Sequence, residues 1–332
     1  MAQIDWRGTA PLFGYQFHQG QPPDPVTSLP RISEERSDSD GLLWVHLDLY
    51  DPAMLAWLRH LPVPGDVIDA VAEPIQRGRL FAFDWIIYGQ LRDLCVPPES
   101  RSHALRAGAL CFLAIPGLVV TGRAEPLMAV RELRNRIENG TAEVYSPIGL
   151  LKAFFEALND IGEDALDASS NELSDMEVEI LRQGRVRNRP DLLRMRREAV
   201  SLVREMAYKR TSMMDLLREK PPLATPGEYR ALRDQLERYR AQIDDLHDYA
   251  DRCQFLLDEL RAQVGESTNR NLYILTIFSA MFMPATLIAG LFGMNVEWLP
   301  FGASAYGFWE VTGIVAVSLG MVLAALRWMR FF

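Results

Sequence analysis

Two long segments without charged side chains lie close to the end of the chain. Residues 271–292 contain no charged residue, and residues 308–326 contain none after Glu310. About 20 apolar residues in a helix span the hydrocarbon core of a bilayer, which is about 30 Å thick. The pattern therefore predicts transmembrane helix 1 over 271–293, a connecting loop over 294–307, transmembrane helix 2 over 308–327 and a short tail over 328–332.

The charges beside these segments indicate their orientation. Arg270 precedes the first segment and Arg327 and Arg330 follow the second, whereas the loop carries Glu297 and no Lys or Arg. Positively charged flanks favour the cytoplasmic side. We therefore expect a multi-pass protein of the cell inner membrane, with both termini in the cytoplasm and the loop outside.

One face of the first segment differs from the rest of its surface. Steps of three and four residues, which stay on one side of a helix, connect six positions there: Leu272, Thr276, Ser279, Met283, Thr286 and Gly290. Such a face suits either close helix packing through small residues or the wall of a water-filled pore. Because two helices cannot enclose a pore, the second interpretation requires a homo-oligomer.

The region before the membrane begins with mixed strands and helices. An alternating apolar pattern predicts a strand over 42–48, and a helix is expected to start after Asp51. Further strands are expected within 80–91 and 109–121, and a helix over 127–138. We therefore predict an α+β cytoplasmic domain over 42–145. Residues 1–41 are rich in Pro and charge and predict a flexible lead-in.

The following region has the period of helices. Cytoplasmic helices are expected over 146–220, and a long stalk helix over 226–270. Apolar positions in the stalk keep a four-three spacing that is typical of a packed helical seam: Leu232, Leu236, Tyr239, Ile243, Leu246, Ala250, Cys253, Leu257, Leu260 and Val264. We expect the stalk to continue into the first span as one rod of roughly 90 Å, at 1.5 Å per residue.

Composition narrows the classes of function. The 332 residues carry a formal charge of −9, which argues against nucleic acid as a partner and favours cations. Cys95, Cys111 and Cys253 are widely spaced and are expected to be reduced thiols. The chain has no nucleophile elbow, no phosphate-binding glycine loop and no HExxH motif. We therefore predict that it is not an enzyme and has no cofactor beyond a transported ion.

A short motif adds a resemblance to a known family. Gly293, Met294 and Asn295 stand at the outer end of the first of two C-terminal spans, after a long helix and before a short tail. This arrangement resembles the signature of the CorA family of divalent-cation transporters. Residues 268–273 and Pro284 are similar to the ZntB zinc-transporter branch of that family. The same branch usually has two glycines where this chain has residues 297 and 298, Glu and Trp.

The resemblance implies a homopentameric funnel in which the first span lines the pore and the second forms an outer ring. It also implies that Gly293, Met294 and Asn295 form the selectivity filter. The favoured function is transport of Zn2+, with proton coupling left open. One alternative is a Mg2+, Co2+ or Ni2+ channel gated by cytoplasmic metal. Another, of a different class, is a coiled-coil scaffold or sensor that is tethered to the membrane and conducts nothing.

Two sets of acidic residues are candidates for cation attraction. Glu297, repeated around a ring, would concentrate cations at the outer mouth. A second set lies on the stalk at helical spacing: Asp244, His247, Asp248 and Asp251. Carboxylate with imidazole suits zinc, whereas carboxylates with water suit magnesium. The same four residues also fit a solvated acidic face opposite the apolar seam.

Overall fold

The computed structural model describes residues 9–30, 41–72, 78–95, 106–183, 189–294, 300 and 306–328. The chain divides into two compact units. The first unit comprises Met1–Gln183 and Arg187–Leu257, and the second comprises Gly184–Val186 and Asp258–Phe332.

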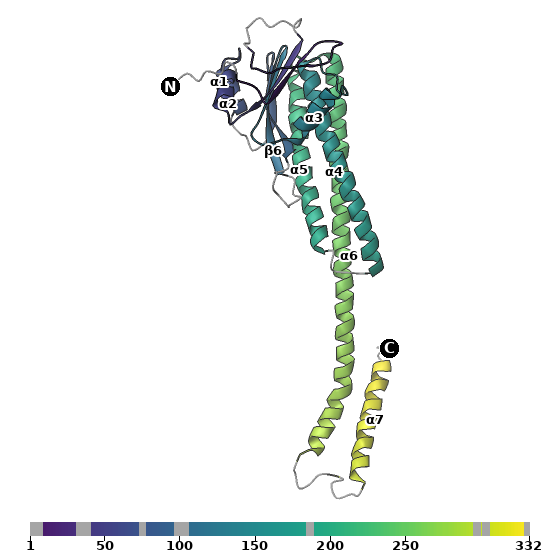
Figure 1. Cartoon of the computed structure of the whole chain (residues 1–332). Coiled ribbons are helices and arrows are strands. Elements are labelled where there is room, and N and C mark those ends of the chain that lie inside the picture. The colour runs from purple at the N-terminus through teal and green to yellow at the C-terminus, as the bar shows by residue number, and fades with distance from the viewer. Residues whose placement is uncertain are drawn as a thin grey trace. The chain divides into compact units, whose positions relative to one another are not determined.

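A seven-stranded sheet forms the centre of the first unit, in the order β2-β1-β3-β7-β6-β5-β4 (Figure 1). Its strands are β1 Phe13–Phe17, β2 Asp24–Pro25, β3 Leu42–Asp48, β4 Arg79–Phe83, β5 Ile86–Cys95, β6 Arg106–Ile115 and β7 Leu118–Arg123. β3 and β7 run parallel, whereas the other neighbouring pairs are antiparallel. The carboxyl ends of β3 and β7 therefore lie side by side.

Helices of the first unit cover both faces of this sheet. They are α1 Pro52–Leu58, α2 Gly65–Ala72, α3 Met128–Glu138, α4 Pro147–Gln183, α5 Arg189–Glu219 and the first part of α6 Pro226–Phe292. The rest of α6 and α7 Gly307–Trp328 belong to the second unit. Successive side chains of a strand point to opposite faces. In β6, accordingly, Phe112 joins the core beneath α3 and α4, whereas Cys111 and Leu113 join the core beneath α1 and α2.

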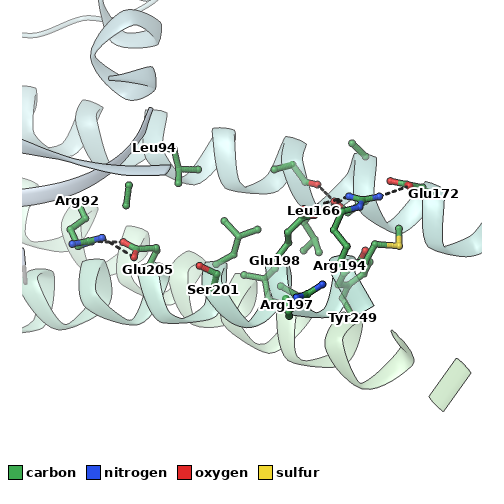
Figure 2. Close-up of a pocket in the computed structure, with 18 residues that line it drawn as sticks. Arg92, Leu94, Leu166, Glu172, Arg194, Arg197, Glu198, Ser201, Glu205 and Tyr249 are labelled. Carbon is green, nitrogen blue, oxygen red and sulfur yellow. Dashed lines mark hydrogen bonds and ion pairs between the residues drawn. The ribbon is translucent and has the colours of Figure 1, made fainter. Parts of the chain in front are cut away.

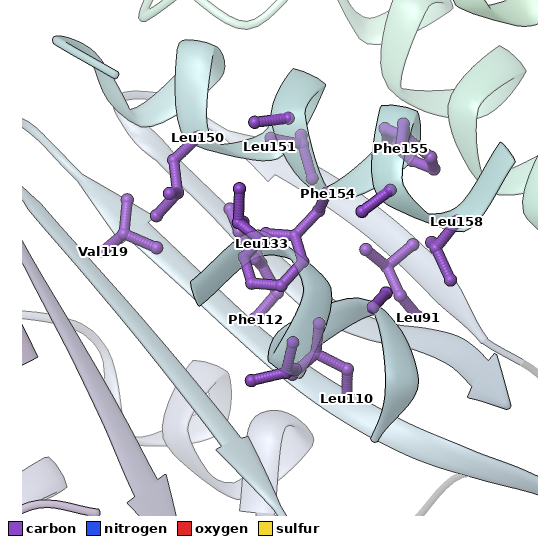
Figure 3. Close-up of a cluster of buried hydrophobic side chains, with 14 of the residues drawn as sticks. Leu91, Leu110, Phe112, Val119, Leu133, Leu150, Leu151, Phe154, Phe155 and Leu158 are labelled. Atoms are coloured by element: carbon purple, nitrogen blue, oxygen red, sulfur yellow. The ribbon is translucent and has the colours of Figure 1, made fainter. Parts of the chain in front are cut away.

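Aliphatic and aromatic side chains together fill the core beneath α3 and α4 (Figure 3). Phe154 of α4 meets Trp44 edge to face at 5.6 Å between ring centroids, and Phe112 at 6.4 Å. The indole of Trp44 donates to the hydroxyl of Thr121 at 2.8 Å. His46 Nδ1 lies 2.7 Å from the same hydroxyl oxygen, and burial lowers the pKa of His46 to about 3. His46 is therefore a neutral structural residue.

The long helix α6 confirms the prediction of a stalk that continues into the first span. It is unbroken from Pro226 to Phe292. The predicted seam is buried from Leu232 to Leu260, and Val264, at 42 % exposure, lies beyond the packed part. Cys95, Cys111 and Cys253 are buried, and none of the three forms a disulfide.

The flexible lead-in predicted over 1–41 is wrong for part of that range. β1 and β2 belong to the sheet, and Tyr15, Phe17 and Leu29 are buried. The alternation of β1 is short and lies among prolines and glycines, so composition concealed it. The predicted boundary between 42–145 and 146–220 also separates no compact units, because α4 and α5 share a core with the sheet.

Candidate cation pathway

The C-terminal part of α6 and the whole of α7 are each long and apolar enough to cross a membrane. In the most apolar stretch of α6 no residue is buried within the chain, and in that of α7 only 6 % are. Apolar side chains left open in this way need lipid or other protein chains to cover them. The observation agrees with the prediction of two membrane-spanning helices.

The six residues of the predicted face, from Leu272 to Gly290, are all exposed on α6. The Thr276 hydroxyl donates to the carbonyl of Leu272 at 2.8 Å, and the Thr286 hydroxyl to that of Phe282 at 2.6 Å. Each hydroxyl uses its proton inside the helix, so its remaining capacity is as an acceptor. This face therefore offers neutral oxygen atoms to whatever covers it.

A shallow groove runs along the end of the same face. Its lining includes Met283, Thr286, Gly290 and Met294. A Cβ atom added at Gly290 would meet nothing within 4 Å, so the groove is open at this position. Three of the six predicted pore-lining residues thus lie along one hollow of the helix surface.

The signature residues begin where α6 ends. The last helical residue is Phe292, and the amide of Gly293 still donates to the carbonyl of Ala289 at 2.9 Å. A Cβ at Gly293 would lie 3.0 Å from that carbonyl oxygen, so glycine permits this close turn. Met294 follows directly. The remaining predicted residues of this region, Asn295 and Glu297, lie outside the described residues.

A proline interrupts the hydrogen bonding of the span. Pro284 lies inside α6 and has no amide hydrogen to donate to the carbonyl of Ala280, four residues earlier. The carbonyl oxygen that is freed adds another neutral acceptor to this part of the helix. The helix continues through the proline to Phe292, as the predicted span requires.

The acidic set on the stalk is exposed, with Asp244, His247, Asp248 and Asp251 all on the open side of α6. Among the residues that the structure describes, no three His, Cys, Asp or Glu side chains converge to hold a metal ion. A single chain therefore provides no metal site there. Metal binding by these four residues stays a prediction that requires several copies of the chain.

A cavity of about 1210 Å³ in the first unit was not predicted (Figure 2). Its polar lining is organised in ion pairs. Arg194 contacts Glu172 at 3.1 Å and Glu198 at 3.2 Å, and Arg92 contacts Glu205 at 2.5 Å. Because each of these carboxylates is already held by a guanidinium group, the cavity is a poor site for a divalent cation.

Known proteins match this chain in sequence and in fold. The family model of "CorA-like Mg2+ transporter protein" matches residues 39–329. The zinc transport protein ZntB of Pectobacterium atrosepticum is 26 % identical over 286 residues, which are 86 % of each chain.

Two solved structures have a similar fold. Full-length CmaX superposes with a TM-score of 0.77 at 24 % identity, covering 98 % of this chain and 99 % of that one. The CorA magnesium transporter from Methanocaldococcus jannaschii superposes with a TM-score of 0.78 at 17 % identity, covering 95 % and 96 %. At these identities the two structures support the fold alone.

Proposed function

The chain belongs to the family of CorA-like Mg2+ transporter proteins, whose model matches residues 39–329, and from that premise we propose that it transports divalent cations, Zn2+ in particular. The path would run through a homo-oligomer in which the α6 spans surround a central pore. A homopentamer is the assembly that we propose, with a surrounding ring of α7 helices in the lipid bilayer. Both termini would lie in the cytoplasm.

The observation that carries this proposal is the continuity of the hydroxyl-bearing face with the signature residues. Thr276 and Thr286 offer neutral oxygens on one side of α6, and Gly293 and Met294 follow at its end. A hydrated divalent cation gives up water reluctantly, so a path of neutral oxygen acceptors suits it better than a cage of carboxylates. A membrane tether would need neither feature.

The filter belongs to the same proposal. Asn295, repeated around a symmetry axis, would present amide oxygens that hydrogen-bond the water shell of the arriving ion. Glu297 would concentrate cations nearby without entering the pore. The acidic set from Asp244 to Asp251 would hold cations between neighbouring copies of α6.

Zinc is proposed because the curated relative from Pectobacterium bears the name of a zinc transport protein. The second candidate is a Mg2+, Co2+ or Ni2+ channel, which the description of the matching family favours. The residues Glu297 and Trp298, where the zinc branch usually has glycines, are the specific reason to keep it. The proposal leaves proton coupling open, because α6 has no acidic residue between 271 and 292 to carry a proton.

The test is metal uptake into liposomes that contain the purified full-length protein. We expect saturable Zn2+ uptake that exceeds Mg2+ uptake, and loss of uptake in Asn295→Ala. Selective Mg2+ flux that ignores a pH gradient would favour the second candidate. Absence of flux for every divalent cation, in protein that is folded and oligomeric, would contradict both.

A further inference from the structure

A small pocket beside the carboxyl ends of β3 and β7 has a lining that is unusual for this chain. Nine residues line it, and three of them are the arginines Arg123, Arg131 and Arg134. None of the nine is acidic, although the whole chain has 44 acidic residues against 35 Lys and Arg. Its volume is about 300 Å³. The pocket lies wholly within the first unit.

The topology of the sheet creates this pocket. Asp48 of β3 and Arg123 of β7 are paired at the carboxyl ends of the two parallel strands. The chain leaves β7 through a short connection and enters α3, which supplies Arg131 and Arg134. The three arginines are therefore gathered beside the carboxyl ends of the one parallel pair among the described strands.

The guanidinium groups retain hydrogen-bond donors. Both hydrogen bonds of Arg134, to Glu138 at 2.8 Å and to Tyr15 at 3.3 Å, use Nε, which leaves its terminal nitrogens as donors. Arg131 is exposed and makes no ion pair with the residues that the structure describes. Burial lowers the pKa of Arg123, and the Asp48 carboxylate partly opposes that shift.

One wall of the pocket is held in place by ring contacts. Phe13 stacks on the buried ring of His46 with 4.7 Å between centroids. The guanidinium carbon of Arg134 lies 5.0 Å from the centre of the Phe13 ring. A guanidinium group held against an aromatic ring is already oriented before a ligand arrives, which reduces the entropy lost on binding.

The amino end of α3 is not open to a ligand throughout, because an amide of its first turn is already occupied. The carboxylate of Asp93 accepts from the amide of Ala129 at 2.9 Å. The positive charge that faces the pocket therefore comes from the arginine side chains.

We propose that this arginine pocket binds a phosphate monoester that carries a small apolar group. A phosphate monoester has nearly two negative charges at pH 7 and three acceptor oxygens, which match several guanidinium groups. The rest of the lining is mainly apolar and includes Leu12, Pro126, Met128 and Val130. None of the residues that line the arginine pocket belongs to the proposed cation path. A test of one proposal therefore does not decide the other.

Calorimetric titration of the full-length protein in detergent tests the proposal. The probes are phenyl phosphate, for a soluble ligand, and dioctanoyl phosphatidic acid, for a lipid headgroup; phenol lacks the phosphate. We expect saturable binding of at least one phosphate probe, no binding of phenol, and weaker binding as salt increases.

Matched arginine variants make the test specific. Arg131→Gln is expected to weaken binding about tenfold, as the loss of one charge-assisted hydrogen bond implies. Arg240→Gln, which removes an exposed arginine paired with Glu237 on α6, is the control and should bind normally. Because Arg131 makes no ion pair within the described part of the chain, Arg131→Gln should keep the thermal unfolding temperature of the parent protein. Saturable binding by neither probe, or equal binding by the Arg131 and Arg240 variants, would overturn the proposal.

Discussion

Replacing Asp93 by Ala is expected to destabilise the first unit by removing a buried carboxylate that serves two elements. Asp93 is 1 % exposed and lies in β5. Its carboxylate accepts from the amide of Leu94 at 2.6 Å and from that of Ala129 at 2.9 Å. Leu127, which precedes α3, provides no side-chain cap, so Asp93 satisfies the helix from a neighbouring strand.

A buried lysine increases the loss of stability that we expect when Asp93 is replaced. Lys209 of α5 is 2 % exposed, and its ammonium group interacts electrostatically with Asp93 and with Glu205. Removing one member of a buried charge pair costs about 3–5 kcal/mol, and loss of a helix cap about 1 kcal/mol. Because Glu205 still compensates Lys209 in part, and because the carboxylate is itself costly to bury, we expect a loss of about 2–4 kcal/mol. That corresponds to roughly 5–15 °C in the midpoint of thermal unfolding.

The assay is thermal unfolding of the full-length protein in detergent, followed by tryptophan fluorescence. Asp234→Ala, which removes an exposed aspartate on α6, is the matched control and should shift the midpoint by little. The double variant Asp93→Ala with Lys209→Met should recover part of the loss, because the unpaired charge is then absent. A midpoint for Asp93→Ala equal to that of Asp234→Ala would show that the Asp93 carboxylate does not stabilise the first unit.

Protonation of Asp93 and two positions in the spans give further predictions. Burial raises the pKa of Asp93 to about 6 from its ordinary 3.8, so between about pH 4 and 6 the native state binds more protons than the unfolded state. The free energy of unfolding of the parent protein, relative to that of Asp93→Asn, should therefore fall as pH rises through that window. A difference between the two proteins that stays constant with pH in denaturant titrations would contradict this. Thr286→Val removes one neutral acceptor per subunit and should slow Zn2+ flux in liposomes by roughly two- to tenfold without changing assembly; unchanged flux would argue against a pore role. A Cβ atom at Gly290, or at Gly313 of α7, would meet nothing within 4 Å. Gly290→Leu should block flux, whereas Gly313→Leu should not. Equal flux in the two variants would contradict the assignment of faces.

Periodic features of the sequence predicted most helices well. The seam of α6 repeats over many turns, so a few atypical residues could not obscure it, and β3 was predicted over the residues that form it. The short β1 was missed because its buried large residues are only Tyr15 and Phe17, which lie near prolines and glycines. A strand this short is stabilised by its neighbours in the sheet and has little pattern of its own.

The candidate sites also differ in how far a local sequence pattern could predict them. The shared face of Thr276 and Thr286 could be predicted because both lie on one helix, where spacing alone determines the side. The arginine pocket could not, since Leu12 and Phe13 come to lie beside Arg123 only after β1 pairs with β3 and β3 pairs with β7. Contacts between distant segments depend on strand order, which the local pattern did not supply. The capping of α3 by Asp93 was unpredictable for the same reason.

In the proposed assembly, the face of α6 that carries Thr286 lines a water-filled cation path. The most direct measurement is Zn2+ flux through Thr286→Cys and Ile288→Cys proteins in liposomes, before and after addition of a water-soluble thiol reagent. Ile288 is two positions away and therefore lies on nearly the opposite side of the helix. We expect the reagent to block flux through Thr286→Cys and to leave flux through Ile288→Cys and the parent protein unchanged. Block of Ile288→Cys with Thr286→Cys unaffected would contradict this expectation.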